Sequence, residues 1–175
     1  RELVNTASGD ELRRILYEYG EERYAPAIAR AICRRREERP IETTLELAEL
    51  IRSAMPASAL REKQHPAKRS FQALRIAVND ELGELPPMLR AAEENLRPGG
   101  RLAVITFHSL EDRIVKRELQ ELFRGCVCPP EFPVCVCGRK PRMKPVSRKP
   151  IVSGAEELAE NPRARSAKLR VAEKC

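Results

Sequence analysis

Residues 1–64 carry apolar side chains at helical spacing. Three stripes place apolar residues at positions such as i, i+3, i+4 and i+7, the face that an amphipathic helix buries. They run through residues 12–19, 24–32 and 47–54. Ser8 and Thr43 each precede a glutamate by three residues, a spacing typical of the capping box that begins a helix. The pattern predicts a small helical unit with no catalytic constellation.

A fourth amphipathic segment follows Pro66, a residue that suits the first turn of a helix. Its apolar positions are Phe71, Leu74, Val78 and Leu82. Its polar positions on a neighbouring face are Lys68, Gln72, Arg75 and Asn79. Two cations and two amides in one stripe can contact phosphates and base edges together. The alternative is an ordinary solvent-exposed helix face.

An almost continuously apolar run, Leu102 to Phe107, follows the turn Gly99–Gly100 and leads into His108 and Ser109. Such a run is typical of a strand buried on both faces, as in a parallel sheet covered by helices. Ligands of open α/β sheets bind beyond the carboxyl ends of the strands. His108 and Ser109 therefore mark a candidate active-site edge. Alternatively they only close the strand, with Ser109 and Asp112 capping the next helix.

The remaining elements are expected from shorter patterns. Pro86 and Pro87 interrupt the segment before a helix around 88–96, and an apolar stripe predicts a helix through Phe123. Ser153, three residues before a glutamate, predicts the cap of a helix ending at Glu160. Strands are expected at 143–151 and 167–172. Helices and strands together indicate an α/β fold.

Charge is uneven along the chain. The net charge is +7, and residues 124–175 hold 12 basic against 5 acidic side chains, whereas residues 1–123 hold 21 of each. A one-sided basic region favours a polyanion partner, although a merely solvated basic tail is the alternative. Aromatic residues make up only 4% of the chain, which argues against a base-stacking platform. No apolar stretch has membrane-spanning length and no signal peptide is evident, so we expect a cytoplasmic protein.

Four cysteines form two C-x-C pairs, Cys126 with Cys128 and Cys135 with Cys137. Four thiols so close together in a cytoplasmic protein favour a soft metal over disulfides, and zinc accepts four thiolates. The spacing departs from the usual C-x-x-C knuckle, so the chain must kink to bring each pair to one ion. Reduced thiols packed in a loop, or a disulfide or redox role, are the alternatives.

Six motifs in series resemble one family, the bacterial small-subunit ribosomal RNA cytosine-N4 methyltransferases (RsmH, also called MraW). The motifs are Tyr19-Gly20-Glu21-Glu22, Arg39-Pro40-Ile41-Glu42-Thr43-Thr44, His65-Pro66, residues 71–82, the segment 98–116, and residues 161–170. They span nearly the whole chain in the order that the family has them.

The resemblance implies the second half of a class I S-adenosylmethionine-dependent methyltransferase sheet, which is Rossmann-like, plus an inserted helical domain. Residues 1–70 would be the helical insertion. Residues 71–175 would be the carboxyl-terminal half of the catalytic domain, with a Cys-rich loop at 124–142. Leu102 to Phe107 would be the fifth strand, and the last two strands would pair antiparallel.

The resemblance also implies methyl transfer from S-adenosylmethionine to the N4 amine of cytosine 1402, in the decoding centre of 16S ribosomal RNA. The partner would be the small ribosomal subunit. His108 and Ser109 would lie beside the target base. The candidate RNA contacts are Lys68, Arg69, Gln72, Arg75, Asn79, Arg113, Lys116, Arg163 and Arg165.

No glycine-rich strand-to-helix turn precedes residue 98, and such a turn is what cradles a nucleotide cofactor in this fold. We therefore expect the main cofactor contacts upstream of Arg1, the chain to be a carboxyl-terminal portion, and that portion to be inactive alone. Two other functions remain open. One is a noncatalytic RNA- or ribosome-binding module with a zinc-stabilised basic loop. The other is a different amine-directed methyltransferase on the same fold.

Overall fold

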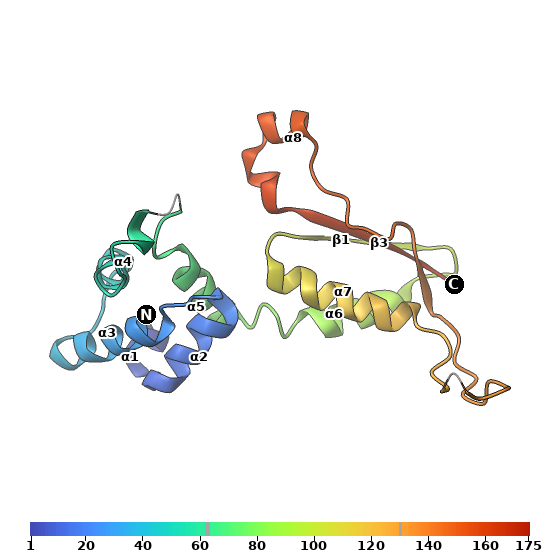
Figure 1. The fold of residues 1–175 in the computed structure, drawn as a ribbon, viewed down its shortest axis with the longest axis horizontal. Helices are drawn as coiled ribbons and strands as arrows, with labels where there is room; N and C mark the ends of the chain where they lie inside the picture. The colour runs from blue at the N-terminus through green and yellow to red at the C-terminus, as the bar shows by residue number, and fades with distance from the viewer. Residues whose placement is uncertain (62–63, 130) are drawn as a thin grey trace. The chain divides into compact units, whose positions relative to one another are not determined.

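The computed structural model describes residues 1–61, 64–129 and 131–175, and the chain divides into two compact units, Arg1–Glu81 and Leu82–Cys175. Figure 1 labels the α-helices and the strands β1 and β3 along the chain. The first unit contains α1 (Glu2–Thr6), α2 (Gly9–Gly20), α3 (Ala25–Glu38), α4 (Thr44–Ser53), η1 (Ala59–Arg61) and α5 (Lys68–Asn79). The second contains α6 (Leu85–Asn95), β1 (Arg101–Thr106), α7 (Ser109–Phe123), β2 (Met143–Pro145), α8 (Ala155–Glu160), η2 (Pro162–Ser166) and β3 (Lys168–Lys174).

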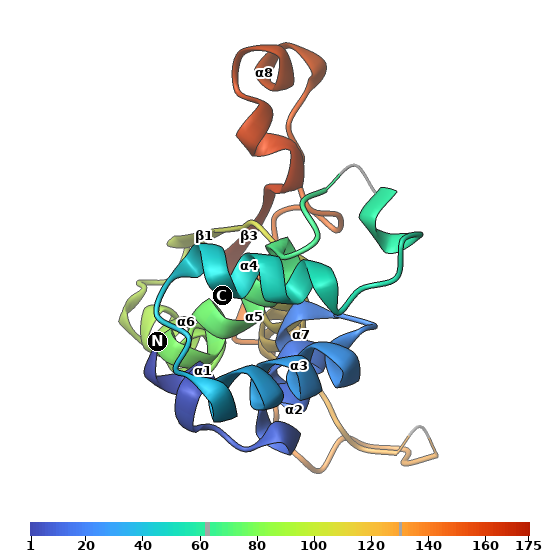
Figure 2. The ribbon, with the colours of Figure 1, turned by 90° about the vertical axis from the view of Figure 1, so that its left-hand side faces the viewer.

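The first unit is helical, as the apolar spacing predicts. Residues of the first two predicted stripes, such as Leu12, Leu16 and Ile28, are fully buried in a common core. The predicted starts are confirmed: the Ser8 hydroxyl accepts the Glu11 N–H at the start of α2, and Thr43 forms both halves of a capping box at α4. Helix α2 packs against α3 and α5 (Figure 2).

Helix α5 buries the expected face only in part: Leu74 is buried and Phe71 packs against the core, as predicted. Ser70, Ala73, Leu74 and Ile76 are its buried residues, whereas Val78 is 65% exposed. Small residues face α2 because the two helices approach closely there: a Cβ on Gly20 would lie 2.9 Å from the Arg69 carbonyl oxygen. The division of the chain after Glu81 places all of α5 in the first unit, whereas the expected boundary lies near residue 70.

The second unit holds a three-stranded sheet in the order β1-β3-β2, with both neighbours antiparallel. The antiparallel pairing of the last two strands agrees with the expectation. Helices α6 and α7 lie on one side of the sheet (Figure 1), and their apolar residues form a core with Met143 and Ala172. The chain is therefore α/β, with a small sheet and many helices.

Strand β1 is not buried on both faces, which corrects the expectation of a covered parallel strand. Its exposure alternates along the strand, and Ile105 is 57% exposed while Thr106 is buried. The described part of the sheet has a helical layer over one face only, so alternate residues of the apolar run point away from that layer.

Three local expectations are wrong in detail. Pro86 and Pro87 do not interrupt a helix but lie in the first turn of α6, where a proline's missing N–H is not needed. Ser153 does not cap α8, since its hydroxyl donates to the Ala164 carbonyl oxygen. The expected strand 143–151 consists of β2 and an isolated bridge at Ile151. Among the described residues, no helix has the length and apolar character needed to cross a membrane.

Candidate functional site

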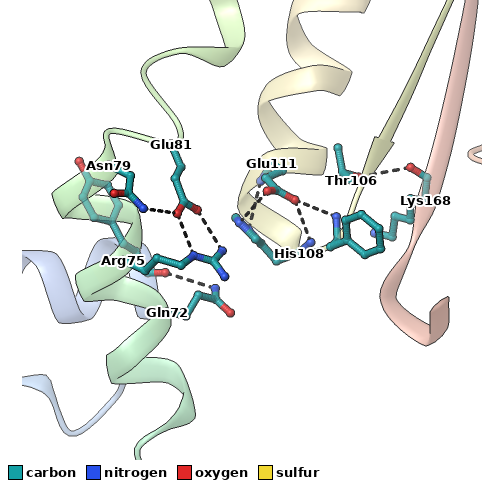
Figure 3. A network of polar contacts seen from close by, with 10 residues as sticks. Gln72, Arg75, Asn79, Glu81, Thr106, His108, Glu111 and Lys168 are labelled. Atoms are coloured by element: carbon teal, nitrogen blue, oxygen red, sulfur yellow. Dashed lines mark hydrogen bonds and ion pairs between the residues drawn. The ribbon is translucent and has the colours of Figure 1, made fainter. Parts of the chain in front are cut away.

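The carboxyl end of β1 and the start of α7 form a tightly hydrogen-bonded corner (Figure 3). Nδ1 of His108 accepts the Glu111 N–H at 3.4 Å, and the Glu111 carboxylate accepts the N–H groups of Phe107 and His108 at 2.7 and 3.2 Å. Nε2 of His108 lies 3.1 Å from Oε1 of Glu111. The N-cap of α7 is therefore His108 in a capping box with Glu111, not Ser109 with Asp112.

Glu111 is held as a carboxylate by this corner. Burial by itself would raise its pKa, but the contacts with the His108 side chain and with the backbone N–H of Phe107 lower it below the ordinary value. A carboxylate that accepts several N–H groups is a weak base. Glu111 is thus a structural cap, and Ser109 begins α7 at an exposed position.

Asp112 joins the start of α7 to β3. Its carboxylate accepts Nε of Arg170 at 2.7 Å and Nζ of Lys168 at 3.1 Å. The hydrogen bond from Arg170 lowers the pKa of Asp112, against the effect of burial, and Lys168 lowers it further. This triad was not predicted from the sequence. The available signal was the i, i+2 spacing of the two cations, which places both on one face of a strand.

In the first unit, the polar face of α5 is organised by Glu81. Its carboxylate accepts Nε and Nη2 of Arg75 at 2.8 and 2.9 Å and Nδ2 of Asn79 at 3.1 Å (Figure 3). Gln72 instead reaches α2, with Nε2 at 3.5 Å from the Tyr19 carbonyl oxygen. Arg75 and Asn79 are thereby fixed side by side, while their side chains stay at the surface.

A hollow of about 320 Å³ lies beside this face of α5. Its walls come from the start of the chain, from the segment before and into α4, and from α5. The lining residues are Arg1, Leu3, Val4, Ile41, Glu42, Thr43, Thr44, Leu47, Phe71, Leu74, Arg75, Val78 and Asn79. Two of the family-like motifs, 39–44 and 71–82, thus meet at one mostly apolar hollow that has a guanidinium and an amide at its rim.

The remaining candidate RNA contacts lie on α7, η2 and the start of α5, and all but Arg69 are exposed. Arg113 and Lys116 are one turn apart on α7. Arg163 and Arg165 lie on η2, whose start is capped by the Asn161 side chain accepting the Arg163 N–H at 3.3 Å. In the first unit, Lys68 is exposed and Arg69 is half-buried at the start of α5.

The four predicted metal ligands come together in the loop between α7 and β2. The Sγ atoms of Cys126, Cys128, Cys135 and Cys137 all lie within 4.8 Å of one another, so the C-x-C spacing does not keep them apart. Backbone N–H groups of Val127 and Arg139 lower the pKa of Cys137 to about 6. The other two cysteines differ: Cys33 packs against the first core, and Cys175 is exposed.

The described residues do not form a nucleotide cradle. Gly99 and Gly100 precede strand β1, and the helix that follows β1 begins at the His108 cap without a glycine turn. An anionic cofactor group, such as the carboxylate of a methionine moiety, would need open backbone N–H groups at such a turn. At this corner those groups are taken by Glu111 and His108.

Comparison with known proteins identifies relatives of the whole chain. The family model described as the MraW methylase family matches residues 1–175. A protein of Heliobacterium modesticaldum named ribosomal RNA small subunit methyltransferase H is 60% identical over 172 residues, 98% of this chain and 55% of the relative. A Carboxydothermus hydrogenoformans protein of the same name is 61% identical over 173 residues, 99% of this chain and 55% of the relative. The chain spans about half the length of the curated relatives it matches.

Proposed function

The chain belongs to the MraW methylase family, and from this we propose that it is part of an S-adenosylmethionine-dependent ribosomal RNA methyltransferase. The substrate we propose is the exocyclic N4 amine of cytosine 1402 in 16S ribosomal RNA. The observation that carries the proposal is the match along all of residues 1–175, together with relatives named for small-subunit ribosomal RNA methylation.

The proposed fold is a class I methyltransferase sheet, with β1 as its fifth strand and β2 and β3 as its last two. The antiparallel pairing of β2 and β3 supports this assignment. Because the described residues offer no cofactor cradle, we assign the main S-adenosylmethionine contacts to the part of the relatives that this chain does not span. We accordingly expect the 175-residue chain to be inactive alone.

The chemistry of the target limits what this chain's residues must do. The lone pair of a cytosine N4 amine is delocalised into the ring, so the amine is a poor nucleophile and must be held in line by fixed neighbours. The base must also leave its stack to be reached. We propose that the corner at His108 and Ser109 lies beside the base, with His108 as a positioning residue because its ring is engaged by Glu111.

We propose that the exposed cations bind RNA phosphates, and Arg75 and Arg163 provide the test. Each alanine variant should weaken binding to the small ribosomal subunit and reduce the salt slope by about one phosphate contact. Glu81→Gln is the matched control for Arg75, because it removes the same ion pair and leaves the guanidinium in place. Arg52→Ala removes a cation outside the candidate set. If all four variants bind the small subunit with the same affinity and the same salt slope, Arg75 and Arg163 are not phosphate contacts.

The activity itself is tested by product identity. A longer protein of the length of the relatives is incubated with S-adenosylmethionine and unmethylated small subunits, and nucleosides are analysed for N4-methylcytidine by mass spectrometry. The 175-residue chain is tested in parallel. Product from the longer protein alone is the expected result. Binding without product from either protein would favour the noncatalytic RNA-binding module, which the basic excess of residues 124–175 also suits.

Zinc bound by the four cysteines would be structural in this enzyme. A catalytic zinc site keeps one open coordination position, and four thiolates leave none.

A further inference from the structure

The sulfur atoms of the loop between α7 and β2 have the spacing of a tetrahedral metal site. Cys135 and Cys137 have their Sγ atoms 3.6 Å apart, and those of Cys137 and Cys126 are 3.7 Å apart. Zinc–sulfur bonds of about 2.3 Å place the four sulfurs of a tetrahedron about 3.8 Å apart. A disulfide would need about 2.05 Å, and all four cysteines are free.

Backbone N–H groups are arranged around the sulfurs in a reciprocal way. The valine within each C-x-C pair donates to the second cysteine of the other pair: Val127 to Cys137 at 3.5 Å and Val136 to Cys128 at 3.4 Å. The N–H of Cys128 also donates to Sγ of Cys126 at 3.4 Å, which curls the first pair. Donors directed at sulfur stabilise thiolates and fix the orientation of metal ligands.

Hydrophobic burial does not explain this cluster. Three of the four cysteines are exposed, and the apolar side chains of the loop, Val127, Phe132, Val134 and Val136, are between 43% and 73% exposed. Free cysteines are normally among the most buried residues. Four neighbouring thiols at the surface bury little apolar area against one another. The hydrophobic effect therefore does not explain why they converge, and another interaction is needed.

The base of the loop is anchored by hydrogen bonds to the end of α7, and hydrogen bonds to sulfur lie nearer its tip. The Arg142 N–H donates to the Leu122 carbonyl oxygen at 2.9 Å, and Nη2 of Arg139 donates to the Glu121 carbonyl oxygen at 3.2 Å. Between these anchors, the described residues form no helix or strand. The loop extends away from the sheet (Figures 1 and 2).

We propose that Cys126, Cys128, Cys135 and Cys137 bind one zinc ion, which takes the place of an apolar core for this loop. Binding releases the thiol protons to solvent and forms four Zn–S bonds around a closed coordination sphere, so nothing is oxidised or reduced. Left-handed Gly138, with φ of 61°, allows the turn directly after the last ligand. The inference does not depend on methyl transfer, since a zinc site can be present in an inactive protein.

The first test is metal content. The full chain, purified under reducing conditions without chelator, should contain about one zinc per chain by elemental analysis. Cys126→Ser and Cys137→Ser should lose most of it, whereas Cys33→Ser and Cys175→Ser should keep it. Zinc content well below one per chain in the reduced, folded wild type would overturn the proposal, as would equal loss in all four variants.

A second readout separates loss of metal from loss of folding. Cobalt exchanged into the site should give the intense visible absorption of a tetrahedral thiolate complex, and this should disappear in Cys126→Ser. Chelation should speed proteolytic cleavage within residues 124–142 and leave the helical circular dichroism of the chain unchanged. If chelation does not alter the cleavage rate, the loop holds its shape without an ion. That result would overturn the proposal that zinc takes the place of an apolar core in this loop.

Discussion

Replacing Asp112 by asparagine should destabilise the second unit by about 2 to 4 kcal/mol at neutral pH. Its side chain is only 12% exposed and Arg170, its principal partner, 15%. Removing one member of a buried pair costs about 3 to 5 kcal/mol, because the other charge stays desolvated. Lys168 is 41% exposed and adds at most about 1 kcal/mol. Asparagine keeps one hydrogen-bond acceptor, which lowers the expected loss.

The loss should depend on pH in a definite direction. Arg170 lowers the pKa of Asp112 in the folded protein. A carboxyl group with a lowered folded-state pKa contributes stability above its unfolded-state value of about 3.9, and this is lost as the pH falls through the lower folded-state pKa. The difference between wild type and Asp112→Asn should therefore be complete at neutral pH and shrink below about pH 4.

Hydrogen exchange of the β3 amides measures this difference, because it reports on the second unit separately from the first. Glu121→Gln is the control, since Glu121 lies in the same unit, is 59% exposed and pairs with the surface residue Arg124, and it should change stability by less than about 0.5 kcal/mol. The reasoning is refuted if the two variants behave alike at neutral pH. It is equally refuted if the cost of Asp112→Asn is the same on both sides of pH 4.

Three further substitutions test the fold. Gly20→Ala should lower the free energy of unfolding in urea by about 1 to 3 kcal/mol, because the new Cβ would lie 2.9 Å from the Arg69 carbonyl oxygen. Gly154→Ala is the control and should be neutral, because the space around Gly154 is open. Thr43→Ala should cost about 1 kcal/mol through loss of its cap, measured in the same way; an unchanged midpoint would contradict the capping box. Glu93→Gln should cost about 3 kcal/mol or more in thermal melting, since this 1% exposed carboxylate pairs with two cations; a loss under about 1 kcal/mol would contradict that pairing.

The helices of the first unit could be predicted from the sequence because each combines an apolar stripe with a cap. Thr43 illustrates this, since its capping box follows from the spacing to a glutamate. The family also followed from motifs, and the comparison confirms it. Neither inference required knowledge of what packs against each element.

The expectations that were wrong depended on what covers an element. Ile105 belongs to an apolar run, but such a run does not indicate whether helices cover one face of the strand or both. In the structure the Ile105 side chain is exposed. Ser109 has the higher intrinsic capping preference, and Asp112 stands three positions after it, but the Asp112 carboxylate binds Lys168 and Arg170 of β3. The Glu111 carboxylate instead accepts the N–H of His108, which makes His108 the N-cap. The partners of Arg75 and Asp112 were missed because side-chain pairing across elements leaves only a weak trace in the sequence.

Strand β3 lies in the middle of its sheet, although it is the last element of the second unit. Among the described residues, β1 and β2 do not pair with each other, and each forms its backbone hydrogen bonds with β3. The pair Arg101 and Glu173 joins residues from near the two ends of the unit's sequence. During synthesis from the amino terminus, the helical unit can therefore acquire its core while β1 still lacks its partner. A translation stop anywhere before residue 168 would leave both other strands without their neighbour. The sheet of the second unit therefore stays incomplete, and open to quality control, until β3 (Lys168–Lys174) has been translated and has left the ribosome.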